Sequence, residues 1–187
     1  MKNLAKSLLG LILYILLIFG TAFLLGHFVV GQVEVDGPSM NDTLQDKDRV
    51  LMNKFTYRVK NLDRFDVVVF KYAYDTDTDY IKRVIGLPGE KVRIDRDGQI
   101  FINDELLEEN YGKEVMEDPG IAEDGITLGE DEYFVLGDNR NNSSDSRHPD
   151  LGAVDTRYII GRALVLAFPG KTAEQDRREW SRIGVLK

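Results

Sequence analysis

The sequence of 187 residues contains no cysteine and only two histidines, His27 and His148. The absence of cysteine excludes disulfides, thiolate zinc sites and cysteine nucleophiles, and two histidines argue against a polyhistidine metal centre. Basic residues are in the minority, with 24 Lys and Arg against 32 Asp and Glu and a formal net charge of -8. Because nucleic-acid binding needs a basic surface, we expect no nucleic-acid partner, and no motif predicts a metal or cofactor.

Charged residues are absent from one long stretch near the N-terminus. The 23 residues from Leu8 to Val30 contain no Asp, Glu, Lys or Arg. As a helix they measure about 34 Å, against a bilayer hydrocarbon core of about 30 Å. A cleavable signal peptide has a shorter apolar region, roughly 7–15 residues, and a small-residue cleavage site, and no Ala-x-Ala follows this stretch. The sequence therefore predicts an uncleaved, single-pass membrane anchor at residues 8–30.

The charges beside this segment predict its orientation. Lys2 and Lys6 precede it, and Glu34 and Asp36 follow it. Positive charges favour the cytoplasmic side. We therefore expect a cytoplasmic stub at residues 1–7 in a cell-membrane protein, and an extracytoplasmic domain at residues 31–187. A cysteine-free chain is compatible with that oxidising compartment. His27, near the outer end of the segment, is interpreted as an interfacial side chain.

The rest of the sequence is typical of β structure. Short runs rich in β-branched residues and bounded by polar residues are predicted strands, and Asp97-Gly98 between two of them is a hairpin signal. We predict a mainly β fold, in which the transmembrane helix is followed by an antiparallel sheet or barrel-like domain. The predicted strands are 49–54, 66–71, 79–85, 92–94, 100–102, 132–136, 158–160 and 162–168.

Two other segments are interpreted differently. Residues 104–131 are acid-rich and alternate poorly, and they contain Pro119, so we predict a small insertion or surface excursion. The alternating acids of 75–79 lack the Gly and the distal Glu of a calcium loop, which favours a solvated hairpin tip.

Ser39 lies in a Gly-Pro turn, in the segment GPSMNDTL at residues 37–44. Ser39 is only nine residue steps beyond Val30, so even an extended chain places it within about 32 Å of the end of the predicted span. Serine is common in turns for structural reasons, and taken alone this one suggests no chemistry.

A second segment, YIKRVI at residues 80–85, places two basic residues side by side in a predicted strand. Because alternate side chains share a face, one of Lys82 and Arg83 should point inward. A buried lysine prefers to be neutral and can then serve as general base to a serine hydroxyl. Lowering its pKa from ~10.4 to about 8 corresponds to roughly 3 kcal/mol. An isolated lysine of this kind is more often a surface residue.

The third polar segment, GDNRNNSSDSR at residues 137–147, follows an apolar run. Its two Asp and two Arg are interleaved with three Ser, which suits a salt-bridged loop positioned by a rigid sheet, although composition alone favours a solvated loop. A Ser-His-Asp triad would depend on His148, which lies beside Pro149 without any signal for a base.

Together these segments, in this order, resemble the type I signal peptidases, membrane-anchored Ser-Lys endopeptidases, and above all their smaller Gram-positive-type members. The resemblance runs from the anchor to about Pro169 and rests on GPSMNDTL, RVLMNK, DVVVFK, YIKRVIGLPGE and GDNRNNSSDSR. It implies a serine endopeptidase that removes N-terminal signal peptides from exported preproteins after small residues, without a cofactor. The implied partners are signal peptides of secretory preproteins, the lipid bilayer and the vicinity of the secretion translocon.

The resemblance also implies roles for individual residues. Ser39 matches the nucleophile, Lys82 the general base, and Ser143 the hydroxyl that orients the base. Met40 matches a residue lining the substrate groove. The residues that match those holding the site together are Asp138, Arg140, Asp145 and Arg147.

The chain departs from the family pattern at two positions. Asp42 stands where Pro is frequent, which changes the rigidity of the turn. Gly37 stands where some members have a hydroxyl that helps to hold the oxyanion, so a backbone amide, that of Ser39, must carry more of this role.

Other functions remain open at this point: a tethered ectodomain that docks a substrate without cleaving it, a Ser-Lys autoprotease of the repressor type, and an organelle inner-membrane processing peptidase. Lys82 argues against the endoplasmic reticulum branch, which uses His as base. Asn41-Asp-Thr43 matches a glycosylation acceptor and is interpreted as a chance match.

Overall fold

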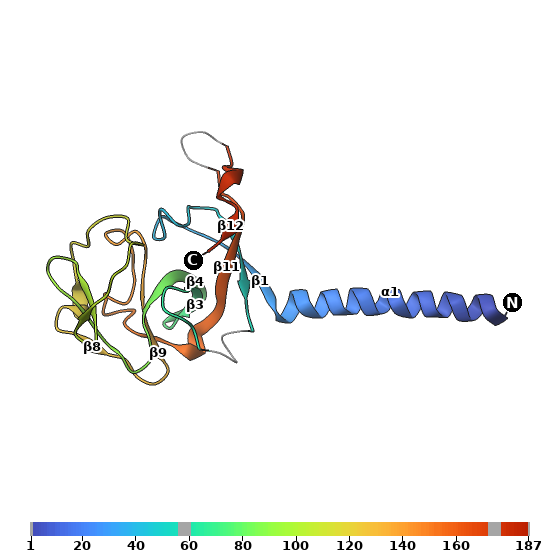
Figure 1. Ribbon diagram of the computed structural model, residues 1–187, viewed down its shortest axis with the longest axis horizontal. Coiled ribbons are helices and arrows are strands. Elements are labelled where there is room, and N and C mark those ends of the chain that lie inside the picture. The colour runs from blue at the N-terminus through green and yellow to red at the C-terminus, as the bar shows by residue number, and fades with distance from the viewer. Residues whose placement is uncertain (1, 56–60, 172–176, 187) are drawn as a thin grey trace.

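The computed structural model describes residues 2–55, 61–171 and 177–186. A single long helix, α1, leads into a body of short strands, and it projects away from that body (Figure 1). The elements are α1 (Lys2–Phe28), β1 (Val30–Glu34), β2 (Arg49–Asn53), β3 (Val67–Tyr72), β4 (Asp75–Gly86), β5 (Lys91–Ile94), β6 (Ile100–Ile102), β7 (Glu105–Leu106), η2 (Gly120–Ala122), β8 (Ile126–Thr127), β9 (Glu132–Leu136), β10 (Val154–Asp155), η3 (Thr156–Tyr158), β11 (Ile159–Phe168), η4 (Trp180–Arg182) and β12 (Gly184–Val185).

Helix α1 is largely apolar, and its described side chains are exposed. Its stretch Lys6–Leu24 is long and apolar enough to cross a membrane, and none of this stretch is buried inside the protein. Large apolar side chains exposed in this way are stable in lipid and costly in water. The helix ends at Phe28 and Val30 already belongs to β1, so the last two residues of the predicted segment 8–30 lie beyond the helix. The side chain of His27 lies outside the described residues.

The larger of two antiparallel sheets carries most of the body. Its strands run in the order β1-β2-β11-β3-β4-β9-β10, and β12 pairs with β11. Strands β1 and β10 stand at the two ends of this order, so the sheet stays open and the barrel-like alternative is not realised. Strand β4, inside the sheet, pairs with β3 on one side and β9 on the other. The side chains of Ile81, Lys82, Arg83 and Val84 in its middle are all buried, so both faces of the strand are covered there.

The smaller sheet has the order β7-β6-β5-β8. Its β5–β6 hairpin turns at Asp97-Gly98, as predicted, and Gly98 adopts the positive φ of 77° that this turn needs. Strands β7 and β8 and the short helix η2 come from the acid-rich segment 104–131. This segment was predicted as an insertion or surface excursion, but Met116, Ala122 and Leu128 are buried in the core beneath the smaller sheet. It is therefore part of the packed body.

The predicted β character is confirmed. Strands β2, β3, β5, β6 and β9 fall within a residue or two of the predicted runs, and 158–160 and 162–168 join into the single strand β11. Strand β4 begins earlier than predicted, at Asp75, so the acids of 75–79 belong to its first half. In the described part of the chain beyond α1, no α-helix is present.

Candidate active site

The turn that carries Ser39 follows β1 and is anchored by its apolar residues. Val35, Met40 and Leu44 are almost completely buried in the core beside β2 and β11. Gly37 has a φ of 84°, which favours glycine, and its N–H donates to Asp46 Oδ1 at 2.8 Å. The apolar residues on either side thus fix the turn while Ser39 faces outward.

Met40, which the resemblance places in the substrate groove, is fully buried in the core next to Ser39. It is not among the residues that line the cavity beside Ser39 in this structure. Its contact with a substrate stays a prediction, while its burial supports the turn from within.

Lys82 lies in the middle of β4 and meets Ser39 directly. Its Nζ is 2.8 Å from Ser39 Oγ and 3.0 Å from the carbonyl oxygen of Ile81. The side chain is 2% exposed. This burial lowers the pKa of Lys82 to about 8, although the nearby carboxylates of Asp145 and Asp138 act in the opposite direction. A substantial fraction of the amine is therefore neutral near physiological pH.

Ser39 and Lys82 open into a groove of about 430 Å³. Strand β1, the edge of the larger sheet, contributes Val33 and Glu34 to one wall, and β4 contributes residues 78–82. Ser144 lines the groove from the loop 137–147. A free strand edge beside a nucleophile is suited to an extended peptide.

Ser143 lies close to Ser39 but makes no hydrogen bond with the amine of Lys82. A side chain added at Gly137 would meet both Ser143 Oγ and the carbonyl oxygen of Ser39, so these two atoms lie close together beside Gly137. Ser143 Oγ is buried and has no hydrogen-bond partner among the described residues. In this structure the carbonyl of Ile81, and not Ser143, holds the amine of Lys82.

Arg83, the neighbour of Lys82, forms a fully buried ion pair with Asp138. Its Nε and Nη2 lie 2.8 and 2.7 Å from the two carboxylate oxygens, and its Nη1 donates to the Phe65 carbonyl at 2.8 Å. Thr43 Oγ1, from the turn of Ser39, donates to the same carboxylate at 2.6 Å. Asp138 therefore ties together the nucleophile turn, the base strand and the loop 137–147.

The sequence placed one of Lys82 and Arg83 on a buried face, and the structure buries both. Side chains on both faces of β4 are covered, since Ile81 and Val84 beside them are buried as well. Burial is tolerated in two different ways. It favours the neutral form of Lys82, whereas Arg83 forms a bidentate ion pair with the carboxylate of Asp138.

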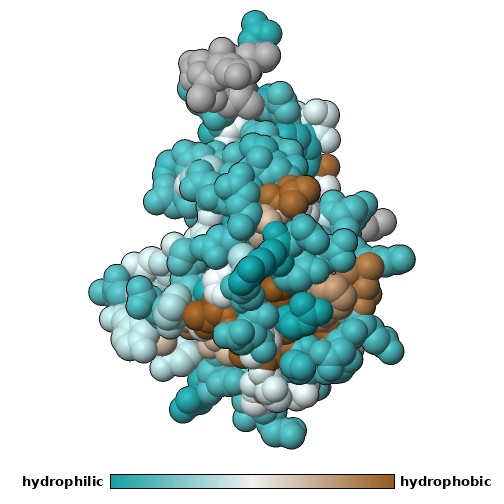
Figure 2. Space-filling model, turned by 90° about the vertical axis from the view of Figure 1, so that its left-hand side faces the viewer, coloured by the Kyte–Doolittle hydropathy of each residue, from teal (hydrophilic) through white to brown (hydrophobic). Residues whose placement is uncertain are grey.

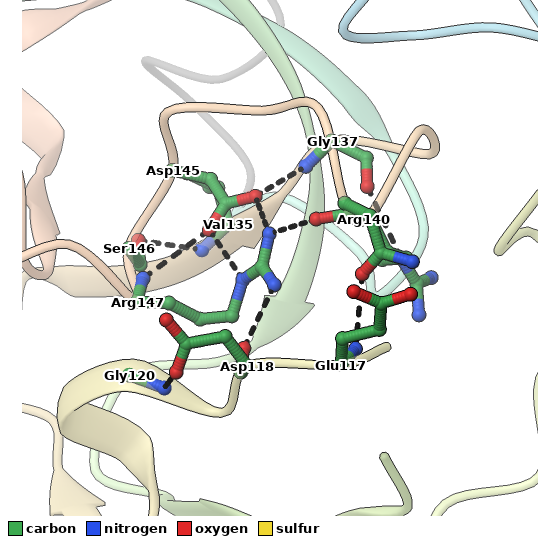
Figure 3. A network of polar contacts seen from close by, with 10 residues as sticks. Glu117, Asp118, Gly120, Val135, Gly137, Arg140, Asp145, Ser146 and Arg147 are labelled. Atoms are coloured by element: carbon green, nitrogen blue, oxygen red, sulfur yellow. Dashed lines mark hydrogen bonds and ion pairs between the residues drawn. The ribbon is translucent and has the colours of Figure 1, made fainter. Parts of the chain in front are cut away.

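A second buried pair stabilises the loop 137–147 itself. Arg147 Nε and Nη2 each lie 2.8 Å from an oxygen of Asp145, and Asp145 also accepts from the N–H of Gly137 (Figure 3). Arg147 further donates to the carbonyl oxygens of Asp118 and Arg140. These contacts close the loop on itself and join it to the segment 104–131.

Arg140 also joins the loop 137–147 to the segment 104–131. Its Nη1 lies 2.7 Å from Glu109 Oε1, and its Nε donates to the Gly137 carbonyl at 3.1 Å. The predicted site-supporting residues Asp138, Arg140, Asp145 and Arg147 are thus gathered in one buried network. Their contribution to catalysis is a proposal.

Asn139 was not predicted, and it braces the nucleophile. Its backbone N–H donates to the Ser39 carbonyl at 3.0 Å, and its Nδ2 donates to the Pro38 carbonyl at 3.1 Å. The N–H of Ser39 has no partner within the described part of the chain, so it is free to donate to a substrate oxygen. No sequence motif predicted that Asn139, Arg83 or Thr43 contact the site. The one available signal was their nearness in sequence to predicted site residues.

Histidine and metal chemistry find no support in this geometry. His148 is exposed and lines a different cavity from the one that contains Ser39. No group of three or more potential ligands that could hold a metal ion occurs among residues 2–55, 61–171 and 177–186.

The comparisons with known proteins agree with this arrangement. The sequence profile of the family described as "Signal peptidase, peptidase S26" matches residues 8–168. The chain therefore belongs to the signal peptidases of peptidase family S26, a family of peptide-bond hydrolases.

Named relatives share much of this length. Signal peptidase I P of Bacillus subtilis subsp. natto is 33% identical over 175 residues, covering 90% of this chain and 93% of the relative. The probable signal peptidase I-2 of Synechocystis sp. (strain PCC 6803) is 37% identical over 147 residues, and that match covers 76% of this chain but only 65% of the relative. A crystal structure of a signal peptidase I from Enterococcus faecalis V583 is 35% identical, with a TM-score of 0.46, over 56% of this chain and 97% of that one.

Proposed function

We propose that this chain is a membrane-anchored serine endopeptidase that removes N-terminal signal peptides from exported preproteins, with Ser39 as nucleophile and Lys82 as general base. The observation that carries the proposal is the distance of 2.8 Å between Lys82 Nζ and Ser39 Oγ, at a buried amine whose pKa is about 8, in a chain of the signal peptidase family.

The first half of the reaction is acylation of the serine. Neutral Lys82 accepts the proton of Ser39 Oγ as this oxygen attacks the scissile carbonyl carbon. The carbonyl oxygen becomes negatively charged, and the unpartnered N–H of Ser39 is suited to stabilise it. Lys82 then protonates the leaving amine, which releases the mature protein and leaves the signal peptide as an ester on Ser39.

The second half returns the enzyme to its starting state. Neutral Lys82 accepts a proton from water, and the hydroxide attacks the ester carbon. Lys82 then gives the proton back to Ser39 Oγ, and the signal peptide leaves with a new carboxyl group. Each half needs the amine uncharged at its start, which is what the burial of Lys82 favours.

Substrate binding follows from the edge strand. The backbone of β1 at Val33 and Glu34 is available to an extended peptide, whose side chains would alternate between the groove and solvent. We propose that residues around the cleaved bond are small. The loop 137–147, held by Asp138, Arg140, Asp145 and Arg147, keeps Ser39 and Lys82 in register, and Ser143 can orient the amine once substrate is bound.

The position of the site suits a substrate held in the membrane. We propose residues 1–7 as a cytoplasmic stub, 8–30 as the anchor and 31–187 as the extracytoplasmic domain, near the translocon from which preproteins emerge. Ser39 follows the end of α1 closely, while the face turned away from α1 is predominantly hydrophilic (Figure 2). Confining enzyme and signal peptide to one surface raises their effective concentration.

The test is processing of a preprotein by the full chain in lipid vesicles. Ser39→Ala and Lys82→Ala should each abolish cleavage while the proteins remain folded by circular dichroism and inserted in the vesicles. Retained cleavage in either variant contradicts the assignment. A serine-directed acylating inhibitor should label the wild type and not Ser39→Ala, whereas a docking protein without peptidase activity would be labelled in neither case.

A further inference from the structure

Two cavities lie against the loop 137–147, and two consecutive serines line one each. Ser144 belongs to the groove that contains Ser39 and Lys82. Ser143 belongs to a second cavity, of about 250 Å³, which we call the loop cavity. The groove and the loop cavity share no lining residue, so at this point a single stretch of loop separates them.

The loop cavity leads from solvent to a buried end. Its rim consists of exposed residues, and its inner end is formed by Arg140, Arg147 and Ser143. In Figure 3 the chain from Glu117 to Gly120 faces Arg140 and Arg147. The exposed rim residues are Glu117, Asp118, Asn141, His148 and Pro149.

Two buried polar atoms at the inner end have no protein partner. Ser143 Oγ and Arg140 Nη2 are buried without a hydrogen bond to any described residue. Buried polar groups are nearly always satisfied by protein or by ordered water. A polar cavity of this size has room for several waters. Both atoms have almost no exposed surface in this arrangement, so a water that binds them at the inner end requires a small shift of the surrounding side chains.

This inner end lies beside the nucleophile. Gly137 has no side chain, and Ser143 Oγ and the Ser39 carbonyl oxygen both lie where its Cβ would be, within 2.2 and 2.5 Å of that point. A Cβ at this position would collide with both. Water bound to Ser143 would thus lie close to the residue that forms the ester.

The reaction needs water at a moment when the groove is occupied. After acylation the signal peptide remains attached to Ser39 and fills the groove, and Lys82 is only 2% exposed. Hydrolysis nevertheless consumes one water for each ester broken. The groove side is then a poor source of that water.

We propose that the loop cavity holds ordered water and supplies the hydrolytic water to the ester on Ser39 by way of Ser143. This inference rests on the proposed function. One O–H bond of the water breaks and its proton passes to Lys82 Nζ, while its oxygen bonds to the ester carbon. The bond from that carbon to Ser39 Oγ then breaks, and Lys82 returns the proton to Oγ. Ser143 acts in this scheme as a positioning residue for water.

The experiment narrows the mouth of the loop cavity without touching the groove. Glu117→Trp places a large side chain on the rim, and His148→Trp does so from another wall in case the first variant folds poorly. Glu114→Trp is the matched control, because Glu114 is an exposed acid of the same segment that does not line the loop cavity. The full chain in detergent micelles is mixed rapidly with a preprotein. Mature protein is measured with time, and the ester-linked enzyme is measured by intact mass spectrometry.

Both rim variants should release the first equivalent of mature protein at the wild-type rate and then turn over about tenfold more slowly, with ester-linked enzyme accumulating. Glu114→Trp should behave as the wild type. Unchanged turnover in folded rim variants overturns the inference, because water then enters where the leaving amine departs. Slower release of the first equivalent also overturns it, since acylation needs no water. A wild-type enzyme that never forms the ester would instead refute the proposed function.

Discussion

Burial of the Lys82 amine should lower the free energy of unfolding, and replacing the amine by an apolar group should raise it. The pKa of this amine is about 8 in the folded chain, against an ordinary value of 10.5. The difference corresponds to about 3 kcal/mol of preference for the neutral form in the folded state. We predict that Lys82→Met, which keeps the length and the apolar stem, is inactive and about 3 kcal/mol more stable than the wild type near pH 7.

The stability penalty of the buried Lys82 amine should depend on pH. Because folding lowers the pKa, the unfolded chain binds the proton more tightly than the folded one, and stability rises as pH rises. The penalty is fully present below about pH 8 and disappears above about pH 10.5, where both states are neutral. The stability difference between Lys82→Met and the wild type should therefore shrink to about 2 kcal/mol at pH 9.

The measurement is urea unfolding of the full chain in detergent micelles, followed by near-ultraviolet circular dichroism at several pH values. Other groups titrate equally in both proteins, so the difference between the two curves isolates Lys82. Lys113→Met, at an exposed lysine, serves as control and should change stability little at any pH. A Lys82→Met protein that is less stable than the wild type, or a gain that is constant with pH, would refute the view that burial keeps this amine neutral.

Two further predictions concern activity and the buried network. The value of kcat/KM for a preprotein should fall about tenfold for each pH unit below about 8, because only neutral Lys82 can accept the serine proton; a profile that is flat down to about pH 5 would exclude this base. Asp138→Asn should lower the free energy of unfolding by about 3–5 kcal/mol, because it leaves the buried charge of Arg83 without its carboxylate. Glu123→Gln, which breaks an exposed ion pair, should have little effect in the same urea titration, and equal effects would contradict the argument.

Local patterns in the sequence were enough to predict most of the strands. Alternation and turn residues act within one strand or one hairpin, so the β5–β6 hairpin at Asp97-Gly98 and the strand β9 lie where they were expected. The turn at Pro88-Gly89 is also present, with Gly89 at a φ of 77° and a hydrogen bond from Glu90 to Leu87. These features depend on backbone geometry that each residue carries with it.

Contacts between distant segments were beyond such patterns. Alternation assigned Lys82 and Arg83 to opposite faces of a strand, but it could not show that both faces would be covered. Likewise nothing in the acid-rich composition of 104–131 revealed that Glu109 would pair with Arg140, or that the Asp118 carbonyl would accept from Arg147. Asn139 contacts the Ser39 turn although β1 and β9 are not neighbours in the larger sheet, a contact that no local pattern carries.

The two buried ion pairs explain how Lys82 can be neutral although two aspartates lie near its amine. The carboxylates of Asp145 and Asp138 raise the pKa of Lys82, and acting alone they would keep it charged and useless as a base. Each carboxylate, however, is held by an arginine in a bidentate contact, Asp138 by Arg83 and Asp145 by Arg147. A buried ion pair contributes little net stability, but it presents almost no net charge to its surroundings. The loop can therefore use aspartates for their geometry, while burial still decides the protonation of Lys82.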